Sequence, residues 1–365
     1  MKAVILSRGT VMENPESIFR YFGWPSVTRL PGGALAAVAS GYRLRHVCPF
    51  GKAVISYSFD EGRTWTRPAP VIDTPLDDRD SGIVPFGNGR VILTSFNNSI
   101  AIQRRWAEKA DESEKRLRLA YLDRISALED AEKYLGSTYV ISEDGGFTFG
   151  KIRNCPVTSP HGPAAAKDGG LLWVGRRFSS DDRFEDPDIP FVQCYRLNEE
   201  DEFEPVGSIE NIPLPDGSGC YNSCEPHALI LNDGTILVHI RVQGGGLFTT
   251  YQSVSRDGGK NFSKPVRLLG DHGGAPAHLM LLPDGTILSV YGYREAPYGI
   301  RYMLSRDGGE HWQTDHVLTD DGESADLGYP CSVLLNDGTI LTVYYENRSG
   351  AAVIRSVKWQ IQTEV

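Results

Sequence analysis

The chain has 365 residues, of which 40% are hydrophobic and 23% are charged, a balance typical of a globular domain. Its net charge of −10 argues against nucleic acid or an anionic membrane as a partner, because both need basic surfaces. No apolar run has the length that a bilayer span requires. Residues 1–12 alternate like a strand and lack the apolar region of a signal peptide, so we expect a cytoplasmic protein.

Six cysteines are spread along the chain, and without a secretion signal we expect them to be reduced thiols. Only Cys220 and Cys224 lie close together in sequence. A C-x₃-C pair without a second pair is weak evidence for zinc. We therefore expect neither a metal site nor a cofactor.

Two turn motifs recur along the chain. One, the Asp box, is Ser-x-Asp-x-Gly-x-x-aromatic, in which Asp caps a hairpin corner, Gly takes a positive φ and the aromatic ring packs between sheets. The other is an Asp-Gly-type turn between two apolar strands. In chain order, the expected elements are a strand at 2–10, a hairpin at 26–40, an Asp box at 58–65, a hairpin at 82–96, a helical segment at 102–134, an Asp box at 142–149, a hairpin at 163–176, two degenerate strands at 193–209, a hairpin at 228–242, an Asp box at 255–262, a hairpin at 277–291, an Asp box at 305–312, a hairpin at 332–345 and a strand at 351–361.

The spacing of the Asp boxes predicts six repeats. The boxes that begin at Ser255 and Ser305 are 50 residues apart, and those at Ser58 and Ser142 are 84 apart, which leaves 50 once a helical insert of about 34 is removed. The boxes at Ser142 and Ser255 are 113 apart, close to two repeats, so one repeat has lost its box. Each repeat supplies four antiparallel strands. The sequence therefore predicts an all-β, six-bladed β-propeller as a single domain over residues 1–365.

The two ends of the repeat array and its one insertion have separate explanations. The last repeat has only three strands of its own, so we expect the strand at 2–10 to add the outer strand of blade six and close the ring. The helical insertion at 102–134 belongs to blade two and lies on the face opposite the Asp boxes. It is either a solvated excursion or a lid or dimer contact.

Ionisable side chains gather on the face opposite the Asp boxes, where six inner strands meet around the axis. For any one of them a surface ion pair is the simpler explanation. Arginines and carboxylates that converge from several blades nevertheless favour a ligand site. The residues expected to contact a ligand there are Trp24, Arg43, Arg45, Arg79, Arg241, Arg294 and Arg301.

With these repeats and Asp boxes, the chain resembles the sialidase (neuraminidase) superfamily of BNR-repeat propellers. The resemblance implies a glycoside hydrolase with a tyrosine nucleophile, a glutamate that activates it, an aspartate acid/base and three arginines that bind a sugar carboxylate. Glu225 in Ser223-Cys-Glu-Pro resembles the glutamate of the family. Tyr329 in Leu327-Gly-Tyr-Pro resembles its nucleophile.

The resemblance also assigns the supporting residues. Arg241, at the end of a strand in blade four, is similar to the second arginine of the family. The third is Arg294 or Arg301. Glu346 falls where the family keeps a glutamate that steadies the first arginine.

Two positions depart from the family pattern. Residues 22–25, Phe-Gly-Trp-Pro, stand where the family has Arg-Ile-Pro, so the first arginine is missing. His46, fourteen residues before Asp60, stands where the acid/base aspartate would fall, and Asp80 is a nearby carboxylate that would substitute. Histidine is a competent general acid near neutral pH.

Three functions fit these residues. We expect first an exo-acting, sialidase-like glycosidase that removes an acidic or otherwise modified terminal sugar. The alternative is a polysaccharide lyase, with His46 as base, Tyr329 as acid and arginines that neutralise a uronate. The third is a non-catalytic carbohydrate-binding propeller. In each case the partner is a glycan rather than a nucleic acid or a membrane.

Overall fold

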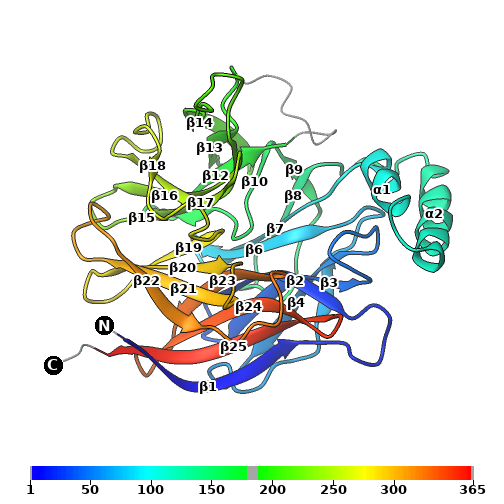
Figure 1. Ribbon diagram of the computed structural model, residues 1–365, viewed down its shortest axis with the longest axis horizontal. Coiled ribbons are helices and arrows are strands. Elements are labelled where there is room, and N and C mark those ends of the chain that lie inside the picture. Colours follow the sequence, from blue (N-terminus) through cyan, green and yellow to red (C-terminus); the bar gives the residue numbers. More distant parts are fainter. Residues whose placement is uncertain (1, 179–187, 363–365) are drawn as a thin grey trace.

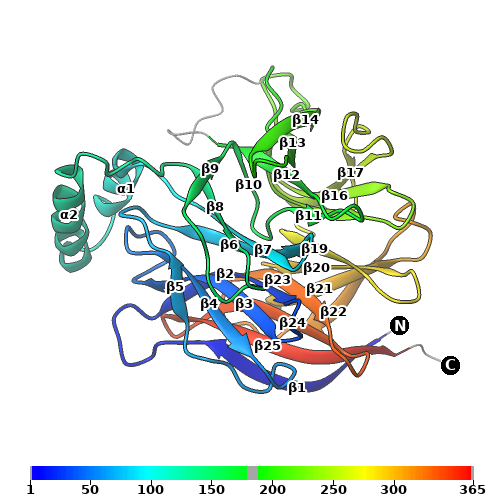
Figure 2. The ribbon, with the colours of Figure 1, turned by 180° about the vertical axis from the view of Figure 1, so that it is seen from behind.

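The computed structural model describes residues 2–178 and 188–362, and within these ranges it holds 25 strands and two helices (Figure 1). The strands form five hydrogen-bonded sheets. The first and last strands of the chain, β1 (Lys2–Met12) and β25 (Ala351–Gln362), lie side by side in both views (Figures 1 and 2). The fold is all-β and propeller-like, as the repeats predict.

Four of the five sheets each take their strands from one sequence repeat. The second repeat forms β6 (Arg79–Phe86), β7 (Arg90–Phe96), β8 (Ser137–Ser142) and β9 (Arg153–Cys155). The third forms β10 (Val157–Thr158), β11 (Ala164–Ala165), β12 (Leu171–Arg177), β13 (Val192–Leu197) and β14 (Phe203–Ile209). The fourth forms β15 (Asn222–Ile230), β16 (Ile236–Gly244), β17 (Leu247–Ser255) and β18 (Val266–Arg267). The fifth forms β19 (Ala277–Leu281), β20 (Ile287–Tyr293), β21 (Gly299–Ser305) and β22 (Gln313–Thr319). The two strands predicted at 193–209 are thus confirmed as β13 and β14.

The remaining sheet joins the two ends of the chain. The first repeat contributes β2 (Tyr21–Arg29), β3 (Leu35–Arg43), β4 (Lys52–Ser58) and β5 (Ala69–Ile72). The last repeat contributes β23 (Leu327–Leu334), β24 (Ile340–Arg348) and β25, and β1 pairs antiparallel with β25 as predicted. A single parallel pair, Tyr21 opposite Ala352, links the two halves. Hydrogen bonding therefore gives five sheets, where the sequence predicts six blades.

The Asp boxes form the corners that their residue types predict. In the third box, Ser255 Oγ donates to Asp257 Oδ1 at 2.9 Å, and the same carboxylate oxygen accepts the backbone N–H of Asn261 at 3.0 Å. The backbone N–H of Gly259, a residue with φ of 91°, donates to Ser255 Oγ at 3.0 Å. The aromatic residue that ends each box packs into a hydrophobic cluster, as seen at Trp65, Phe149, Phe262 and Trp312.

The Asp-box carboxylates predict a stability effect at low pH. Hydrogen bonds from the backbone and side chain of Asn261 lower the pKa of Asp257 from 3.8 to about 2. Because the folded-state pKa is depressed, this carboxylate stabilises the fold above pH 4, and the contribution is lost as the pH falls toward 2. We predict that Asp257→Asn lowers the melting temperature at pH 7 and that its gap to the wild type narrows between pH 4 and pH 2. Thermal denaturation followed by circular dichroism measures this, and a gap independent of pH would contradict it.

The insertion predicted at 102–134 forms two helices, α1 (Ile100–Ala107) and α2 (Glu112–Ser126), between β7 and β8. Side-chain oxygens of Ser99 and Asp111 cap their first turns. Figures 1 and 2 show both helices at one edge of the molecule, outside the sheets. Tyr121 of α2 fastens them to the first repeat, because its hydroxyl donates to Pro75 O at 2.8 Å. Neither helix in the described part of the chain is long and apolar enough to cross a membrane.

Candidate functional site

Four inner strands each carry a β-bulge whose central residue is not glycine but has a positive φ. These residues are Trp24 in β2, Asp80 in β6, Glu225 in β15 and Tyr329 in β23, with φ from 47° to 54°. This backbone conformation costs about 1–3 kcal/mol per residue and is concentrated at functional sites. The four side chains converge, since the Trp24 and Tyr329 rings lie 6.3 Å apart and the charge of Glu225 acts on Asp80.

A proline follows most of these positions. It follows Trp24, Glu225 and Tyr329, and also Gly162 and Ala275 at the corresponding points of the third and fifth repeats. A proline restricts the backbone of the residue before it, so the surrounding strand pair must hold the bulge in place. The X-Pro dipeptide at the start of a repeat is therefore a sequence signal for this ring of residues, and the predictions missed it.

Glu225, Arg241 and Tyr329 form a hydrogen-bonded set at the centre of the ring. The Tyr329 hydroxyl donates to Glu225 Oε1 at 2.7 Å. Arg241 Nη1 donates to Glu225 Oε2 at 2.6 Å and to Tyr329 Oη at 3.2 Å. Arg241 lies in β16 opposite Cys224, so the β15–β16 pair places the arginine and the glutamate together. The structure thus brings together three of the residues that the resemblance singles out.

The surroundings of this set move the pKa values of the Tyr329 phenol and the Glu225 carboxyl in opposite directions. Burial raises the pKa of the Tyr329 phenol well above 10, and the neighbouring charge of Glu225 adds to the rise. Burial also acts to raise the pKa of Glu225, but Arg241 and the Tyr329 hydrogen bond outweigh it and hold this pKa below 4.5. At neutral pH the arrangement is therefore a phenol that donates to a carboxylate.

Arg294, one of the two candidates for the third arginine, lies beside this set. Its guanidinium carbon lies 5.7 Å from the centre of the Tyr329 ring and 5.2 Å from that of Phe248, over which Arg241 also stacks at 4.7 Å. Arg294 Nε donates to Leu327 O at 3.1 Å, but Nη2 is buried without a hydrogen-bond partner among the described residues. A buried donor without a partner costs about 1–3 kcal/mol, which an acceptor on a ligand would recover.

Arg79 and Asp80 form the second repeat's side of the site. Within the described ranges, Arg79 Nε and Asp80 Oδ1 are both buried without a hydrogen-bond partner. Burial raises the pKa of the Asp80 carboxyl to about 7. The positive charge of Arg79 acts to lower this pKa, and the negative charge of Glu225 acts to raise it. Asp80 is thus a carboxyl group that can gain or lose a proton near neutral pH.

Trp24 and Arg43 are not placed to touch a substrate, contrary to prediction. Both side chains are fully buried. Arg43 forms a two-fold ion pair with Asp77, at 2.5 and 3.0 Å, and its guanidinium lies 4.8 Å from the Trp24 ring. Arg79 covers the same ring at 4.4 Å. Trp24 therefore packs beneath the site. The strand pattern alone did not show whether a side chain at this position lines the site or lies under it.

Arg301 and Glu346 also have structural partners in place of the predicted ones. Arg301 is 8% exposed and donates to the carbonyls of Thr319 and Pro297. Glu346 pairs with Arg348 at 2.8 Å and Arg355 at 3.2 Å, so it steadies these two arginines.

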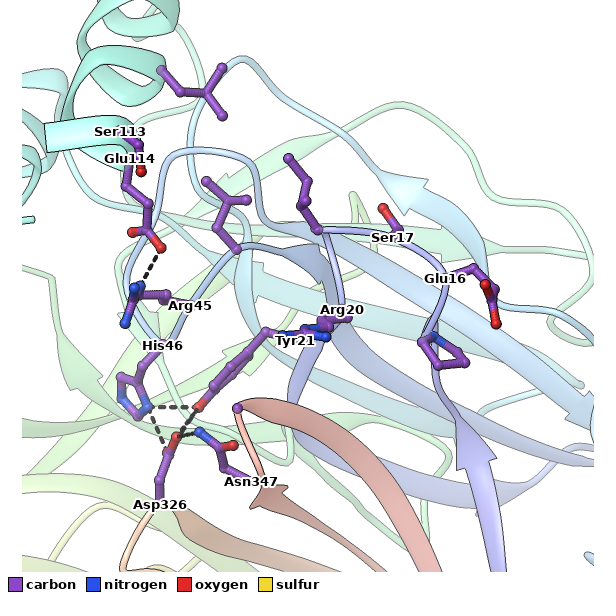
Figure 3. Close-up of a pocket in the computed structure, with 15 residues that line it drawn as sticks. Glu16, Ser17, Arg20, Tyr21, Arg45, His46, Ser113, Glu114, Asp326 and Asn347 are labelled. Atoms are coloured by element: carbon purple, nitrogen blue, oxygen red, sulfur yellow. Dashed lines mark hydrogen bonds and ion pairs between the residues drawn. The ribbon is translucent and has the colours of Figure 1, made fainter. Parts of the chain in front are cut away.

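Two cavities open beside the central set. The larger, of about 880 Å³, is lined by residues that include Tyr21, Arg45, His46, Glu114 and Asp326 (Figure 3). The smaller, of about 170 Å³, is lined by residues that include Arg79, Asp80, Trp106, Arg176 and Glu225. Trp106 belongs to α1 and Glu114 to α2, so the insertion forms part of the wall of both cavities. This placement favours the lid interpretation over a solvated excursion.

His46 and Arg45 enter the larger cavity in different ways. His46 Nδ1 lies 3.0 Å from Asp326 Oδ1 and 2.8 Å from Tyr21 Oη. Arg45 pairs with Glu114 and Asp111 and so ties α2 to the first repeat. Tyr21 was not among the predicted site residues, because nothing in local spacing links it to Asp326, which lies 305 positions away.

Histidines from three repeats also meet at the axis. The rings of His161, His227 and His278 lie within 5.4 Å of one another, and His161 and His227 are buried while His278 is half-buried. In the part of the chain that the structure describes, no group of three His, Cys, Asp or Glu side chains is arranged to hold a metal ion. All six cysteines are free thiols.

Comparisons with known proteins agree with this fold. A protein of unknown function from Dyadobacter fermentans DSM 18053 has 21% sequence identity and a TM-score of 0.73, with 99% of each chain covered. Hadza microbial sialidase Hz136 has 16% identity and a TM-score of 0.63, with 96% of this chain and 68% of that chain covered. Trypanosoma rangeli sialidase in complex with the inhibitor DANA has 14% identity and a TM-score of 0.60, and the match covers 98% of this chain but 57% of that one.

No curated protein matches the chain significantly. The family model described as "BNR repeat-like domain" matches residues 110–342, well over half of the chain. This match shows that the chain belongs to the BNR repeat-like domain family, and the sialidase neighbours share its fold.

Proposed function

We propose that the protein is an exo-acting, sialidase-like glycosidase that hydrolyses a terminal acidic sugar from a glycan. The hydrogen-bonded set of Tyr329, Glu225 and Arg241 carries the proposal. A phenol held 2.7 Å from a buried carboxylate is the arrangement that a tyrosine nucleophile needs.

In this mechanism Tyr329 Oη attacks the anomeric carbon while its proton passes to Glu225. The phenol cannot ionise unaided at neutral pH, because burial raises its pKa well above 10. A neutral tyrosine also avoids the repulsion that a carboxylate nucleophile would meet at an anionic sugar. Water then displaces the sugar from Tyr329, which regains its proton from Glu225.

Arg241 and Arg294 are the proposed contacts for the acidic group of the sugar. The buried Nη2 of Arg294 and the buried Nε of Arg79 supply donors that the described protein groups leave unused. Asp80 Oδ1 supplies an unused acceptor for a sugar hydroxyl. A proton must also reach the departing oxygen, and His46 and Asp80 are the two groups suited to deliver it.

For the architecture, we infer six blades closed into a ring. Each half of the eight-stranded sheet has four antiparallel strands, and only the pair Tyr21–Ala352 joins them. Two blades that touch at one point account for this pattern. The whole of residues 1–365 then forms one domain.

The missing first arginine predicts weak activity on simple sialosides. Gly23 stands where the resemblance expects that arginine, and buried Trp24 fills the neighbouring space. One charge-assisted contact contributes about 1.5–3 kcal/mol. We therefore predict that kcat/KM for a 4-methylumbelliferyl α-sialoside is roughly 10- to 100-fold below that of the preferred sugar. Equal or faster fluorescence release from the sialoside would contradict this.

A screen of aryl glycosides tests the function itself. Sialic acids, uronic acids, rhamnose and arabinose are offered as 4-nitrophenyl glycosides, and ultraviolet absorbance of the sugar product is followed alongside. Release of 4-nitrophenol together with a saturated acidic sugar is the expected result. An unsaturated uronide formed from a 4-linked uronate oligosaccharide offered in parallel would assign a lyase, and binding without turnover would assign a carbohydrate-binding propeller.

A further inference from the structure

The inner end of the larger cavity holds a histidine fixed by two partners from distant parts of the chain. Figure 3 shows His46, Tyr21 and Asp326 joined by hydrogen bonds at one end of the cavity, with Arg45 and Glu114 farther along its wall. Tyr21 belongs to β2, and Asp326 immediately precedes β23. The first and last repeats therefore meet at His46.

Asp326 is held as an acceptor of several hydrogen bonds. Its carboxylate accepts from the hydroxyl of Tyr21 at 2.9 Å, from that of Tyr345 at 3.0 Å and from Asn347 Nδ2 at 2.9 Å. Burial opposes ionisation, but His46 and these donors keep the pKa of Asp326 far below 3.8. A carboxylate has no proton to give, so the contact at 3.0 Å requires His46 Nδ1 to carry the hydrogen.

This contact determines what the other ring nitrogen does. With the hydrogen on Nδ1, Nε2 of neutral His46 is a base, and Nε2 of protonated His46 is an acid. Among the described residues, none hydrogen-bonds Nε2. The imidazole side chain is 45% exposed, and its ring stands edge-on to Trp24 at 4.9 Å. The centre of the Trp24 ring in turn lies 6.3 Å from that of Tyr329, so Trp24 links His46, in the lining of the larger cavity, to the central set.

The cavity itself suits an uncharged part of a glycan. Of its charged side chains, Arg45 and Glu114 form an ion pair, and so do His46 and Asp326. Apolar Ile18 and Leu117, 64% and 41% exposed, alternate along it with polar side chains such as Ser17 and Ser113. Sugar rings present apolar faces and hydroxyl edges, which match such a surface.

We propose that Asp326 and Tyr21 position His46 as the acid that protonates the leaving oxygen, and that the larger cavity receives the leaving-group sugars. This inference rests on the proposed glycosidase function. As Tyr329 Oη bonds to the anomeric carbon, the bond from that carbon to the leaving oxygen breaks. The proton on His46 Nε2 passes to that oxygen, and the Tyr329 proton passes to Glu225. In the second half, neutral His46 takes a proton from the attacking water, and Glu225 returns its proton to Tyr329.

The surroundings of His46 predict its pH dependence. Burial lowers its pKa from 6.5, and the positive charges of Arg79 and Arg43 add to the fall, whereas Asp326 opposes it. The other ionisable groups that line the cavity are Glu16, Arg20, Tyr21, Arg45 and Glu114. His46 loses its acidic proton as the pH rises through this lowered pKa. On the alkaline side of the pH profile, we therefore expect the midpoint of the loss of activity to lie below pH 6.5. Asp326→Asn removes the group that raises the pKa and shifts this midpoint further down.

Histidine titration by NMR tests this positioning without any substrate. The signal of His46 is assigned by its absence in His46→Gln. We expect its pKa to lie below 6.5 in the wild type and to fall further in Asp326→Asn. Tyr21→Phe, which keeps the aromatic ring, provides the same test if Asp326→Asn does not fold. Tyr345→Phe is the matched control, since it loses one hydrogen bond to Asp326 but none to His46. A His46 pKa that is the same in all these variants would overturn the positioning role.

Leaving-group dependence tests the proton transfer. The probes are 2,4-dinitrophenyl and phenyl glycosides of the sugar that the screen returns. His46→Gln is expected to lower kcat/KM, which reports the first half of the reaction, by about 10²- to 10⁴-fold for the phenyl glycoside, while kcat/KM for the 2,4-dinitrophenyl glycoside, whose leaving group needs no proton, changes less than about tenfold. Equal losses on both probes, or selective loss in Asp80→Asn instead, would overturn the inference. Failure of the glycosidase proposal is distinguishable, because Tyr329→Phe would then leave both probes unaffected.

Discussion

Tyr329→Phe is expected to lower turnover by about 10³-fold or more, because it removes the atom that bonds to the sugar. Glu225→Gln is expected to have a comparable effect, since the buried phenol then has no carboxylate to take its proton. Both losses are expected in kcat as well as in kcat/KM. Steady-state kinetics on the best aryl glycoside of the screen measures them.

Tyr329→Phe is expected to fold as the wild type does, which separates catalysis from stability. Tyr329→Phe removes a hydroxyl from a ring that is already packed against Trp24 and Tyr345, and Glu225 keeps its ion pair with Arg241. Circular dichroism spectra and melting temperatures close to those of the wild type are the control. Unchanged turnover in both variants would remove the basis of the assignment.

Arg43→Met is expected to lower the free energy of unfolding by about 3–5 kcal/mol. The side chains of Arg43 and Asp77 are both fully buried, and they form two hydrogen bonds with each other. Methionine fills similar space but leaves the Asp77 carboxylate buried without its counter-charge. The hydrogen bond that Gln103 Nε2 donates to this carboxylate, at 3.1 Å, supplies no charge to replace it. Urea denaturation at neutral pH measures the change.

Two further variants sharpen this measurement. Arg8→Met breaks an exposed ion pair with Asp321, which is expected to contribute less than about 1 kcal/mol. The double variant Arg43→Met with Asp77→Leu removes both charges and is expected to recover much of the loss. A loss in Arg43→Met no larger than in Arg8→Met would show that the buried pair does not stabilise this part of the fold.

Local turn chemistry explains why the sequence predicts so much of the fold. Asp257 and Gly259 form their corner with residues at most four positions away, so the motif can be recognised in the sequence without knowledge of any tertiary contact. The pairing of β1 with β25 followed from counting strands. The single contact between Tyr21 and Ala352, which merges two groups of strands into one sheet, has no comparable local signature.

The sequence was sufficient to predict which strands contribute to the candidate site, but not which way each side chain points. Motif spacing placed Glu225, Arg241 and Tyr329 on one face, and the structure brings them into hydrogen-bond contact. Arg43 ends β3 and Arg241 lies near the end of β16, yet Arg43 points into the interior. Its partner Asp77 decides that direction, and their pairing across 34 positions depends on how two strands pack.

Covalent labelling tests the central claim most directly. The enzyme is incubated with a fluorinated glycosyl fluoride of the sugar that it releases, which slows hydrolysis of a glycosyl-enzyme, and is then digested for peptide mass spectrometry. The proposed mechanism predicts one added sugar mass on the peptide that contains Tyr329 and none in Tyr329→Phe. A label on a different residue, or the same added sugar mass on Tyr329→Phe, would contradict it.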